Sequence, residues 1–290
     1  MLEFKEIGLS AREEIEKYTA QSDYRSCEYG FANLFIWRGT YHTEYALADG
    51  CLFIRFHEDA GEALLFPAGN GDKKRAVRAI CETQGDGAVF SANEEQKEFL
   101  MREFPGEFSF TPVRNAQEYL YNASDLIDLS GGRYHAKRNH IAHFEQKTEG
   151  EALYRRITQA DIPACKEAYE NWARVHGGGE ESEQTAVYEA LEHFSALGLS
   201  GGLIGMGDEV CAFSVGCRLN SDTYDVLIEK AMSGYEEAYA VINQRFAADF
   251  CSGFRYINRE EDMGIEGLRK AKLSYHPALL PEKYLVRRCR

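Results

Sequence analysis

The sequence lacks any C-x-x-C pair and any stretch of about 20 uninterrupted apolar residues, the length that a bilayer crossing requires. Its 8 cysteines mostly lie inside apolar runs such as Val210-Cys211-Ala212-Phe213, where cysteine acts as a small core hydrophobe. Four histidines also lack the spacing of zinc ligands: His135, His140, His143 and His176. We therefore expect neither a structural metal site nor a membrane span.

Positive charge is scarce as well. The chain has 33 Lys and Arg against 47 Asp and Glu, a formal net charge of −14. Broad, non-specific phosphate binding is therefore disfavoured, and a nucleic-acid partner would need a local basic patch. The first six residues, MLEFKE, do not begin a secretory signal, since no basic and then apolar region follows. We expect a soluble, cytoplasmic protein with reduced thiols.

The chain has 290 residues, which favours two domains over one. In the first half, a three-strand meander precedes alternating helices and strands, and an Asp49-Gly50 turn joins its first two strands. The predicted strands are 4–7, 43–48, 51–57, 63–66, 88–91 and 108–113, and the predicted helices are one that follows a cap at Ser10, 72–84 and 93–104.

The second half is predicted to repeat this order. A basic helix at 134–146 comes first, and the Gly-rich segment 177–181 is interpreted as a loop over a site. The remaining predicted strands are 152–156, 199–206, 210–219, 223–229 and 254–258, and the helices are 161–175, 183–197, 235–250 and 264–273. We place the domain boundary near 122–130, giving domains 1–125 and 126–290.

A meander followed by strand-helix alternation predicts an α/β class of the α+β type, with mixed sheets covered by helices. The same order occurs in the GNAT acyltransferase fold, in which the middle strands splay and the acyl donor enters between them. The sequence therefore predicts a tandem GNAT-like acyltransferase fold with two similar domains.

The segment Asn258-Arg259-Glu260-Glu261-Asp262 follows a predicted strand, at the edge where open α/β sheets place ligands. Its three carboxylates could hold a cationic group, and Arg259 could pair with a phosphate or stabilise negative charge. The alternative is a group of acids at the positive end of a helix. Glu229 and Lys230 end the strand beside the predicted cleft, as a general base and an oxyanion partner, or as an ordinary charged strand end.

Two basic stretches could form the local patch that an acidic protein needs for tRNA or for another phosphate. A solvated helix face is the competing interpretation. The candidate phosphate-binding residues are Arg133, Lys137, Arg138, Arg269, Lys270 and Lys272.

No Ser-His-Asp or Cys-His set is identifiable by its sequence context. The turn at 231–238, AMSGYEEA, takes the place of the Gly-rich loop with which ordinary GNAT enzymes hold the pyrophosphate of coenzyme A. It has one glycine and two acids, and carboxylates would repel a pyrophosphate. We therefore expect no bound cofactor.

Several segments together resemble the C-terminal domain of phosphatidylglycerol lysyltransferases and its stand-alone bacterial relatives. They are IEKA at 228–231, YAVINQ at 239–244, YINREEDMG at 256–264, GLRKAK at 267–272 and GRYHAKRNHI at 132–141. The resemblance extends to the aromatic segment near Trp37.

This resemblance implies a tandem GNAT fold akin to the Fem-type peptidyltransferases, with aminoacyl-tRNA as the donor. On this hypothesis the chain is a lysyl-type aminoacyltransferase whose acceptor is a small molecule, a peptide or a lipid. Glu229, Lys230 and Arg259 are the candidate catalytic residues. The candidate substrate-binding residues are Asn258, Glu260, Glu261, Asp262, Tyr235 and Asn243.

Two other functions stay open from the residues. One is a coenzyme A-dependent N-acetyltransferase, and the other is a non-catalytic binder of a small cationic metabolite. The acceptor, the amino acid and the oligomeric state are likewise open.

Overall fold

The computed structural model describes residues 2–58, 61–85, 88–176 and 181–289. It divides into two compact units: Met1–Tyr119 with Glu261–Lys270 and Leu279–Arg290 forms the first, and Leu120–Glu260 with Ala271–Ala278 the second. The domain limits 1–125 and 126–290 stay a prediction. The loop predicted at 177–181 falls largely outside the described residues.

The first unit holds a sheet with the strand order β1-β2-β3-β4-β6-β14-β7, and β5 pairs with β3. Its strands are β1 (Lys5–Glu6), β2 (Glu44–Ala48), β3 (Cys51–Glu58), β4 (Gly61–Leu65), β5 (Ala68–Gly69), β6 (Val89–Asn93), β7 (Phe108–Pro112) and β14 (Lys283–Arg288). Its helices are α1 (Arg12–Ser22), α2 (Phe31–Tyr41), α3 (Lys73–Gln84) and α4 (Glu94–Glu103).

In the first unit, a predicted hairpin turn and a predicted helix cap are both present. Asp49 and Gly50 both have positive φ, 49° and 76°, as a tight hairpin turn between β2 and β3 requires. Asn93 caps α4 through a capping box with Gln96. Edge-to-face contacts of Phe108 with Phe90 and Phe104 fill the core beneath the sheet.

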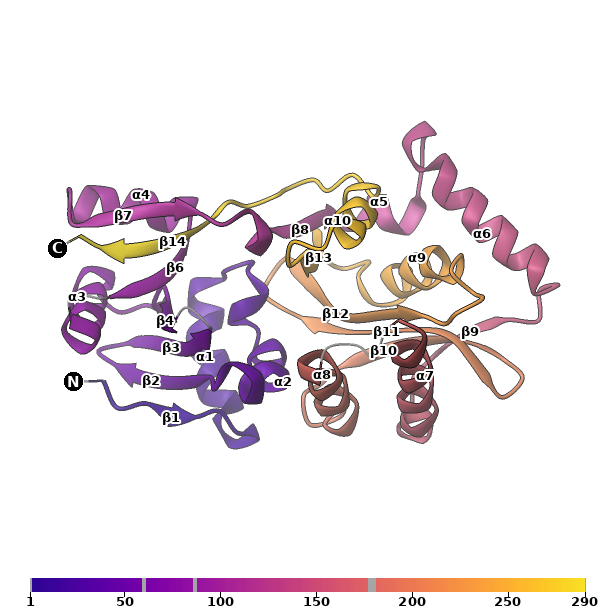
Figure 1. Cartoon of the computed structure of the whole chain (residues 1–290), viewed down its shortest axis with the longest axis horizontal. Helices are drawn as coiled ribbons and strands as arrows, with labels where there is room; N and C mark the ends of the chain where they lie inside the picture. Colours follow the sequence, from indigo (N-terminus) through magenta and orange to yellow (C-terminus); the bar gives the residue numbers. More distant parts are fainter. Residues whose placement is uncertain (1, 59–60, 86–87, 177–180, 290) are drawn as a thin grey trace. The chain divides into compact units, whose positions relative to one another are not determined.

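The second sheet has the order β8-β13-β12-β11-β10-β9. In Figure 1, α9 covers one face of this sheet, and α7 and α8 lie on the other. Its strands are β8 (Glu118–Asn122), β9 (Leu153–Arg156), β10 (Ser200–Met206), β11 (Glu209–Arg218), β12 (Thr223–Ala231) and β13 (Tyr256–Glu261). Its helices are α5 (Ala123–Asp128), α6 (His135–Lys147), α7 (Ile162–Val175), α8 (Glu181–Glu192) and α9 (Ala238–Phe250). The last helix, α10 (Glu266–Leu273), belongs to the first unit up to Lys270 and to the second from Ala271.

The parallel strands β12 and β13 separate part of the way along. Residues 223–225 of β12 pair with 256–258 of β13, while β12 continues to Ala231 against β11. The register between β11 and β12 also shifts between Val215 and Gly216, which bends the strands at this point. The end of β12 and the end of β13 therefore form the two sides of a splayed junction.

Each sheet contains a strand from the other half of the sequence. β14, at the end of the chain, lies between β6 and β7 and pairs antiparallel with both. β8 comes from the first half and completes the second sheet beside β13. The predicted element order did not include β14.

The α/β class with two mixed sheets is confirmed, and the chain has the expected tandem GNAT-like fold, a meander followed by a parallel pair in each half. None of the described helices combines the length and apolar character of a bilayer crossing.

Candidate functional site

A buried ion pair joins the separated ends of β12 and β13 in the second unit. The Nη2 of Arg259, on β13, donates to Oε1 of Glu229, on β12, at 2.6 Å. The side chains are only 13% and 9% exposed. Because low-dielectric surroundings strengthen the attraction and an unpaired charge would be costly there, each charge fixes the position of the other.

Asn243 from α9 completes this group. Its Nδ2 donates to Oε2 of Glu229 at 3.0 Å, so both carboxylate oxygens are held. Two buried atoms beside the pair have no hydrogen-bond partner among the described residues: Nη1 of Arg259 and Oδ1 of Asn243. Buried polar atoms are seldom left unpaired, so this donor and this acceptor, both on residues that contact Glu229, suggest a place for a ligand.

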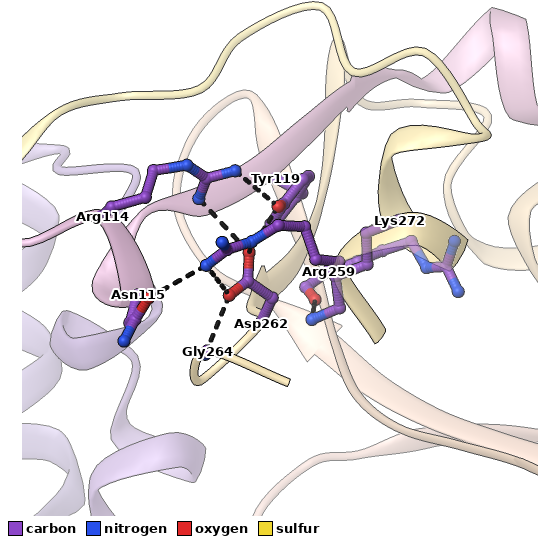
Figure 2. Close-up of polar contacts among 8 residues, drawn as sticks. Arg114, Asn115, Tyr119, Arg259, Asp262, Gly264 and Lys272 are labelled. Atoms are coloured by element: carbon purple, nitrogen blue, oxygen red, sulfur yellow. Dashed lines mark hydrogen bonds and ion pairs between the residues drawn. The ribbon is translucent and has the colours of Figure 1, made fainter. Parts of the chain in front are cut away.

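Aromatic rings and two lysines surround Arg259. Its guanidinium carbon lies 5.7 Å from the ring centre of Tyr121 and 4.9 Å from that of Tyr275. The buried Lys272 donates to the carbonyl oxygen of Arg259 at 2.5 Å (Figure 2). Lys137 lies 3.8 Å from the centre of the Tyr275 ring, and burial, followed by repulsion from Arg259, lowers its pKa to about 8.

Lys230 points into a different part of the second unit. Its Nζ donates to Oε1 of Glu183 on α8 at 2.7 Å. It also lies 3.7 Å from the ring centre of Trp172 and 5.9 Å from that of Tyr169, both on α7. Burial lowers the pKa of Lys230, and Glu183 opposes this effect. The carboxylate and the two rings form a cage, named here the Lys230 cage.

Asp262 belongs to the first unit and is fully buried. Figure 2 shows its carboxylate bonded to Arg114 at 3.2 Å, to Tyr119 at 2.5 Å and to the backbone amide of Gly264 at 2.9 Å. Arg269 adds two contacts of 2.8 Å. The hydrogen bond from Arg269 is the largest cause that lowers the pKa of this carboxyl. The side chain is thus fully engaged within its own unit.

The neighbours of Asp262 serve local structure. The Oδ1 of Asn258 accepts from the amide of Glu260 at 2.8 Å, and Glu260 has a positive φ of 55°. Burial raises the pKa of Glu261, which lies near Lys283 and Glu118 in the first unit. The five consecutive polar residues 258–262 therefore belong to two different units, and their side chains have different surroundings.

Most of the predicted phosphate-binding residues make contacts inside the protein. Arg133 pairs with Asp125 at 2.8 Å, and Arg138 donates to the carbonyl oxygens of Leu129 and Gly131. Lys270 is exposed. Tyr235, predicted to bind substrate, donates to Glu209 at 3.2 Å. The assignment of all these residues to a ligand stays a prediction.

Sequence reasoning did not find Glu183, Trp172, Tyr121 or Tyr275. The three-residue spacing of Tyr169 and Trp172 indicates a shared helix face, but nothing local ties that face to Lys230. Tyr121 and Tyr275 come from segments more than 150 residues apart in sequence, so only the fold brings them to Arg259. Within the described ranges, no group of three or more His, Cys, Asp or Glu is arranged to hold a metal ion.

Comparison with known proteins gives one family. The sequence model of "Phosphatidylglycerol lysyltransferase, C-terminal" matches residues 19–287. The crystal structure of a conserved protein of unknown function from Bacteroides thetaiotaomicron is 37% identical, with all of both chains covered and a TM-score of 0.94.

One more distant solved structure shares the fold, and one curated protein matches in sequence. L-PGS from Bacillus licheniformis is 13% identical, with 95% of this chain and 91% of that chain covered and a TM-score of 0.66. An uncharacterised protein of Mycoplasmoides gallisepticum is 23% identical over 175 residues, 60% of this chain. The chain spans about half of that curated relative's length, 56%.

Proposed function

The chain belongs to the phosphatidylglycerol lysyltransferase C-terminal family, and from this premise we propose that it transfers an aminoacyl group from tRNA to an acceptor hydroxyl or amine. The observation that carries the proposal is the splayed junction with its Glu229–Arg259 pair, where Nη1 of Arg259 and Oδ1 of Asn243 are left over. An aminoacyl ester presents the complementary atoms. Its carbonyl oxygen accepts a hydrogen bond, and its α-ammonium group donates one.

The proposed reaction requires only group transfer. The acceptor oxygen or nitrogen attacks the ester carbonyl carbon, and its proton passes to Glu229 directly or through a water. Arg259 stabilises the negative oxygen that forms. When the tetrahedral intermediate collapses, the bond to the ribose oxygen breaks, and that oxygen takes the proton from Glu229. Asn243 orients the α-ammonium group throughout.

Lys230, the third predicted catalytic residue, is proposed to have a positioning role. Since Lys230 is held by Glu183 and two rings, we propose that it positions α7 and α8 beside the junction instead of contacting the developing charge. Lys137 and Lys272 lie near Arg259 and are proposed to attract the phosphates of the donor's terminal nucleotide.

One contact disfavours the coenzyme A alternative. In the turn before α9, the amide of Gly234 donates to Oε1 of Glu236 at 3.0 Å. A pyrophosphate would have to compete with this carboxylate for the amide and would be repelled by its charge. Calorimetric heat on adding acetyl-CoA at sub-millimolar concentration would restore this alternative.

The direct test uses tRNA charged with labelled amino acids, incubated with the protein and a total lipid and peptide extract. We expect label to leave the tRNA and appear in a new product. The Glu229→Gln variant should slow this transfer by about 100-fold, as the loss of a general base does. The proposal fails if the wild-type protein moves no label from any tRNA beyond spontaneous hydrolysis.

A further inference from the structure

We propose that Ser214 on β11 is a positioning residue, which accepts a hydrogen bond from Glu229 after Glu229 has taken the acceptor's proton. This inference rests on the proposed function and extends it to a residue that acts only through Glu229. A carboxylate that is protonated during the reaction needs a hydrogen-bond acceptor for its new O–H group. The donors and acceptors around Glu229 decide which side chain can be that acceptor.

Ser214 lies directly opposite Glu229 in the second sheet. The antiparallel register of β11 and β12 pairs these two residues. Side chains that are directly opposite in such a pair lie on the same face of the sheet, with Cβ atoms about 5 Å apart. Glu229 is on the face covered by α9 (Figure 1), because Asn243 of that helix donates to it. Ser214 therefore lies beside Glu229, between the sheet and α9.

The hydroxyl of Ser214 is buried and unpaired. The residue is 0% exposed, and its Oγ has no hydrogen-bond partner among the described residues. A buried hydroxyl without a partner destabilises the folded state, and the neighbouring residues Phe213 and Val215 show that this part of β11 is apolar. Full burial also excludes Ser214 as a nucleophile toward an incoming ester. Its hydroxyl is thus a cost to stability that a role in the reaction would explain.

The groups that hold Glu229 are donors. Nη2 of Arg259 and Nδ2 of Asn243 each donate to one carboxylate oxygen. Such bonds favour the charged carboxylate, and neither nitrogen can accept a hydrogen bond from the protonated form. Oδ1 of Asn243 is an acceptor, but the proposed function assigns it to the α-ammonium group of the donor. The unpaired Oγ of Ser214, on the adjacent strand, is therefore the acceptor that we assign to protonated Glu229.

The proton moves once in each direction. When the acceptor's proton reaches Glu229, Nη1 of Arg259 bonds the negative oxygen of the tetrahedral intermediate. The new O–H of Glu229 donates to Oγ of Ser214, directly or through one buried water. When the intermediate collapses, the proton leaves Glu229 for the ribose oxygen. Ser214 itself neither gains nor loses a proton.

Other titratable side chains lie around Glu229 or on its strand. They are Arg259, Lys137, Tyr239, Tyr275 and Asp225. Burial raises the pKa of both tyrosines and lowers that of Lys137 to about 8. These groups and Arg259 therefore keep nearly constant charge between about pH 5 and 7. Asp225 lies near the start of β12, opposite Asn258, and Glu229→Gln separates its titration from that of Glu229.

The test measures how transfer depends on pH. Release of label from charged tRNA is followed in single turnovers with protein in excess, from about pH 5 to 8, and spontaneous hydrolysis is subtracted. The wild-type rate should rise with pH as Glu229 loses its proton, and then level off. In Ser214→Ala the plateau should fall about fivefold, and the midpoint of the rise should move to lower pH by about half a unit, because neutral Glu229 has lost a hydrogen bond. Affinity for charged tRNA should not change.

Tyr224→Phe is the matched control. The hydroxyl of Tyr224, near the start of β12, is also buried without a partner among the described residues, and its ring packs against Phe246 and Phe254. Removing either unpaired hydroxyl should raise Tm by about 2 °C, but only Ser214→Ala should move the midpoint. Ser214→Thr keeps an acceptor and suits a strand, so it should keep the wild-type midpoint.

Four results would contradict the assignment of Ser214. The first is a lower plateau with an unchanged midpoint, and the second is an equal shift in Tyr224→Phe, since both indicate a structural effect. The third is a shift in Tyr239→Phe but not in Ser214→Ala, which would give the role to Tyr239. The fourth is a pH dependence that persists in the residual activity of Glu229→Gln and so belongs to another acid.

Failure of the proposed function has a different signature. If the wild-type protein moves no label at any pH, the proposed function itself fails, and the inference about Ser214 fails with it. If the wild-type protein transfers label and Ser214→Ala has the same plateau and midpoint, only the inference is overturned.

Discussion

Two charged clusters, built around Arg259 and around Asp262, differ in how fully their polar atoms are hydrogen-bonded. In the second unit, the Glu229–Arg259 pair leaves a guanidinium nitrogen and the oxygen of Asn243 without a partner among the described residues. In the first unit, five contacts saturate the carboxylate of Asp262. A saturated carboxylate stabilises a fold, whereas a buried pair with polar atoms left over can still bind a ligand.

The largest effect is expected when the cation of the Glu229–Arg259 pair is removed. Arg259→Met should lower the rate of aminoacyl transfer by about 100-fold or more, because an oxyanion donor is lost and Glu229 is left buried without its cation. Single-turnover transfer from charged tRNA measures this loss. Arg255→Met, at an exposed arginine just before β13, is the control and should keep nearly full activity. An active Arg259→Met protein would remove Arg259 from the reaction.

An intermediate effect should appear in stability when the saturated cluster is altered. Asp262→Asn keeps the shape but removes the charge facing Arg269 and Arg114. Because these arginines are partly exposed, we expect a loss of about 2 kcal/mol in the free energy of unfolding, or roughly 5 °C in Tm. Transfer by the folded fraction should stay within about twofold. A large loss of transfer at unchanged Tm would instead make Asp262 part of the site.

The dependence of stability on acid pH also tests the role of Asp262. The pKa of Asp262 is lowered in the fold, so its stabilising effect is complete above about pH 4, the unfolded value, and is lost as the pH falls toward the folded value. Denaturant melts of Asp262→Asn should lack this part of the acid dependence.

The smallest effect concerns Lys137. Its pKa of about 8 means that it loses its charge at lower pH than an unfolded lysine does. Affinity for tRNA should therefore fall a few-fold as the pH rises from about 7 to 9, because one phosphate contact is lost. Between pH 8 and about 10.5 the unfolded chain binds more protons, so this lysine's contribution to the free energy of unfolding rises with pH. In Lys137→Arg the decrease in affinity should be absent.

Much of the fold was predictable because its signals are local. The Asp49-Gly50 turn, the cap at Asn93 and the alternation of apolar residues depend on near neighbours in sequence. The strand exchange was not predictable in this way. Nothing in the short sequence KYLVRR at 283–288 indicates that it pairs with strands β6 and β7, about 170 residues or more away along the chain.

The site was predictable only in part, for a related reason. Glu229 and Asn243 stand out as polar residues next to apolar runs, and Arg259 as the cation of the polar segment 258–262, and the fold brings the three together. The sequence could not show that Lys230 has Glu183 and Trp172 for partners, since those contacts cross the sheet to α7 and α8. It also could not separate Arg259 from Asp262, because whether a carboxylate is saturated depends on residues such as Arg114 and Tyr119.

The placement of β14 has a consequence for biosynthesis. Strands β6 and β7 cannot close their sheet until residues 283–288 have left the ribosome, so the first half of the chain waits with two unsatisfied edges while the second half is translated. The order of synthesis and the order of folding are therefore reversed for this sheet. Until residues 283–288 are made, the facing edges of β6 and β7 are open to pairing with other chains.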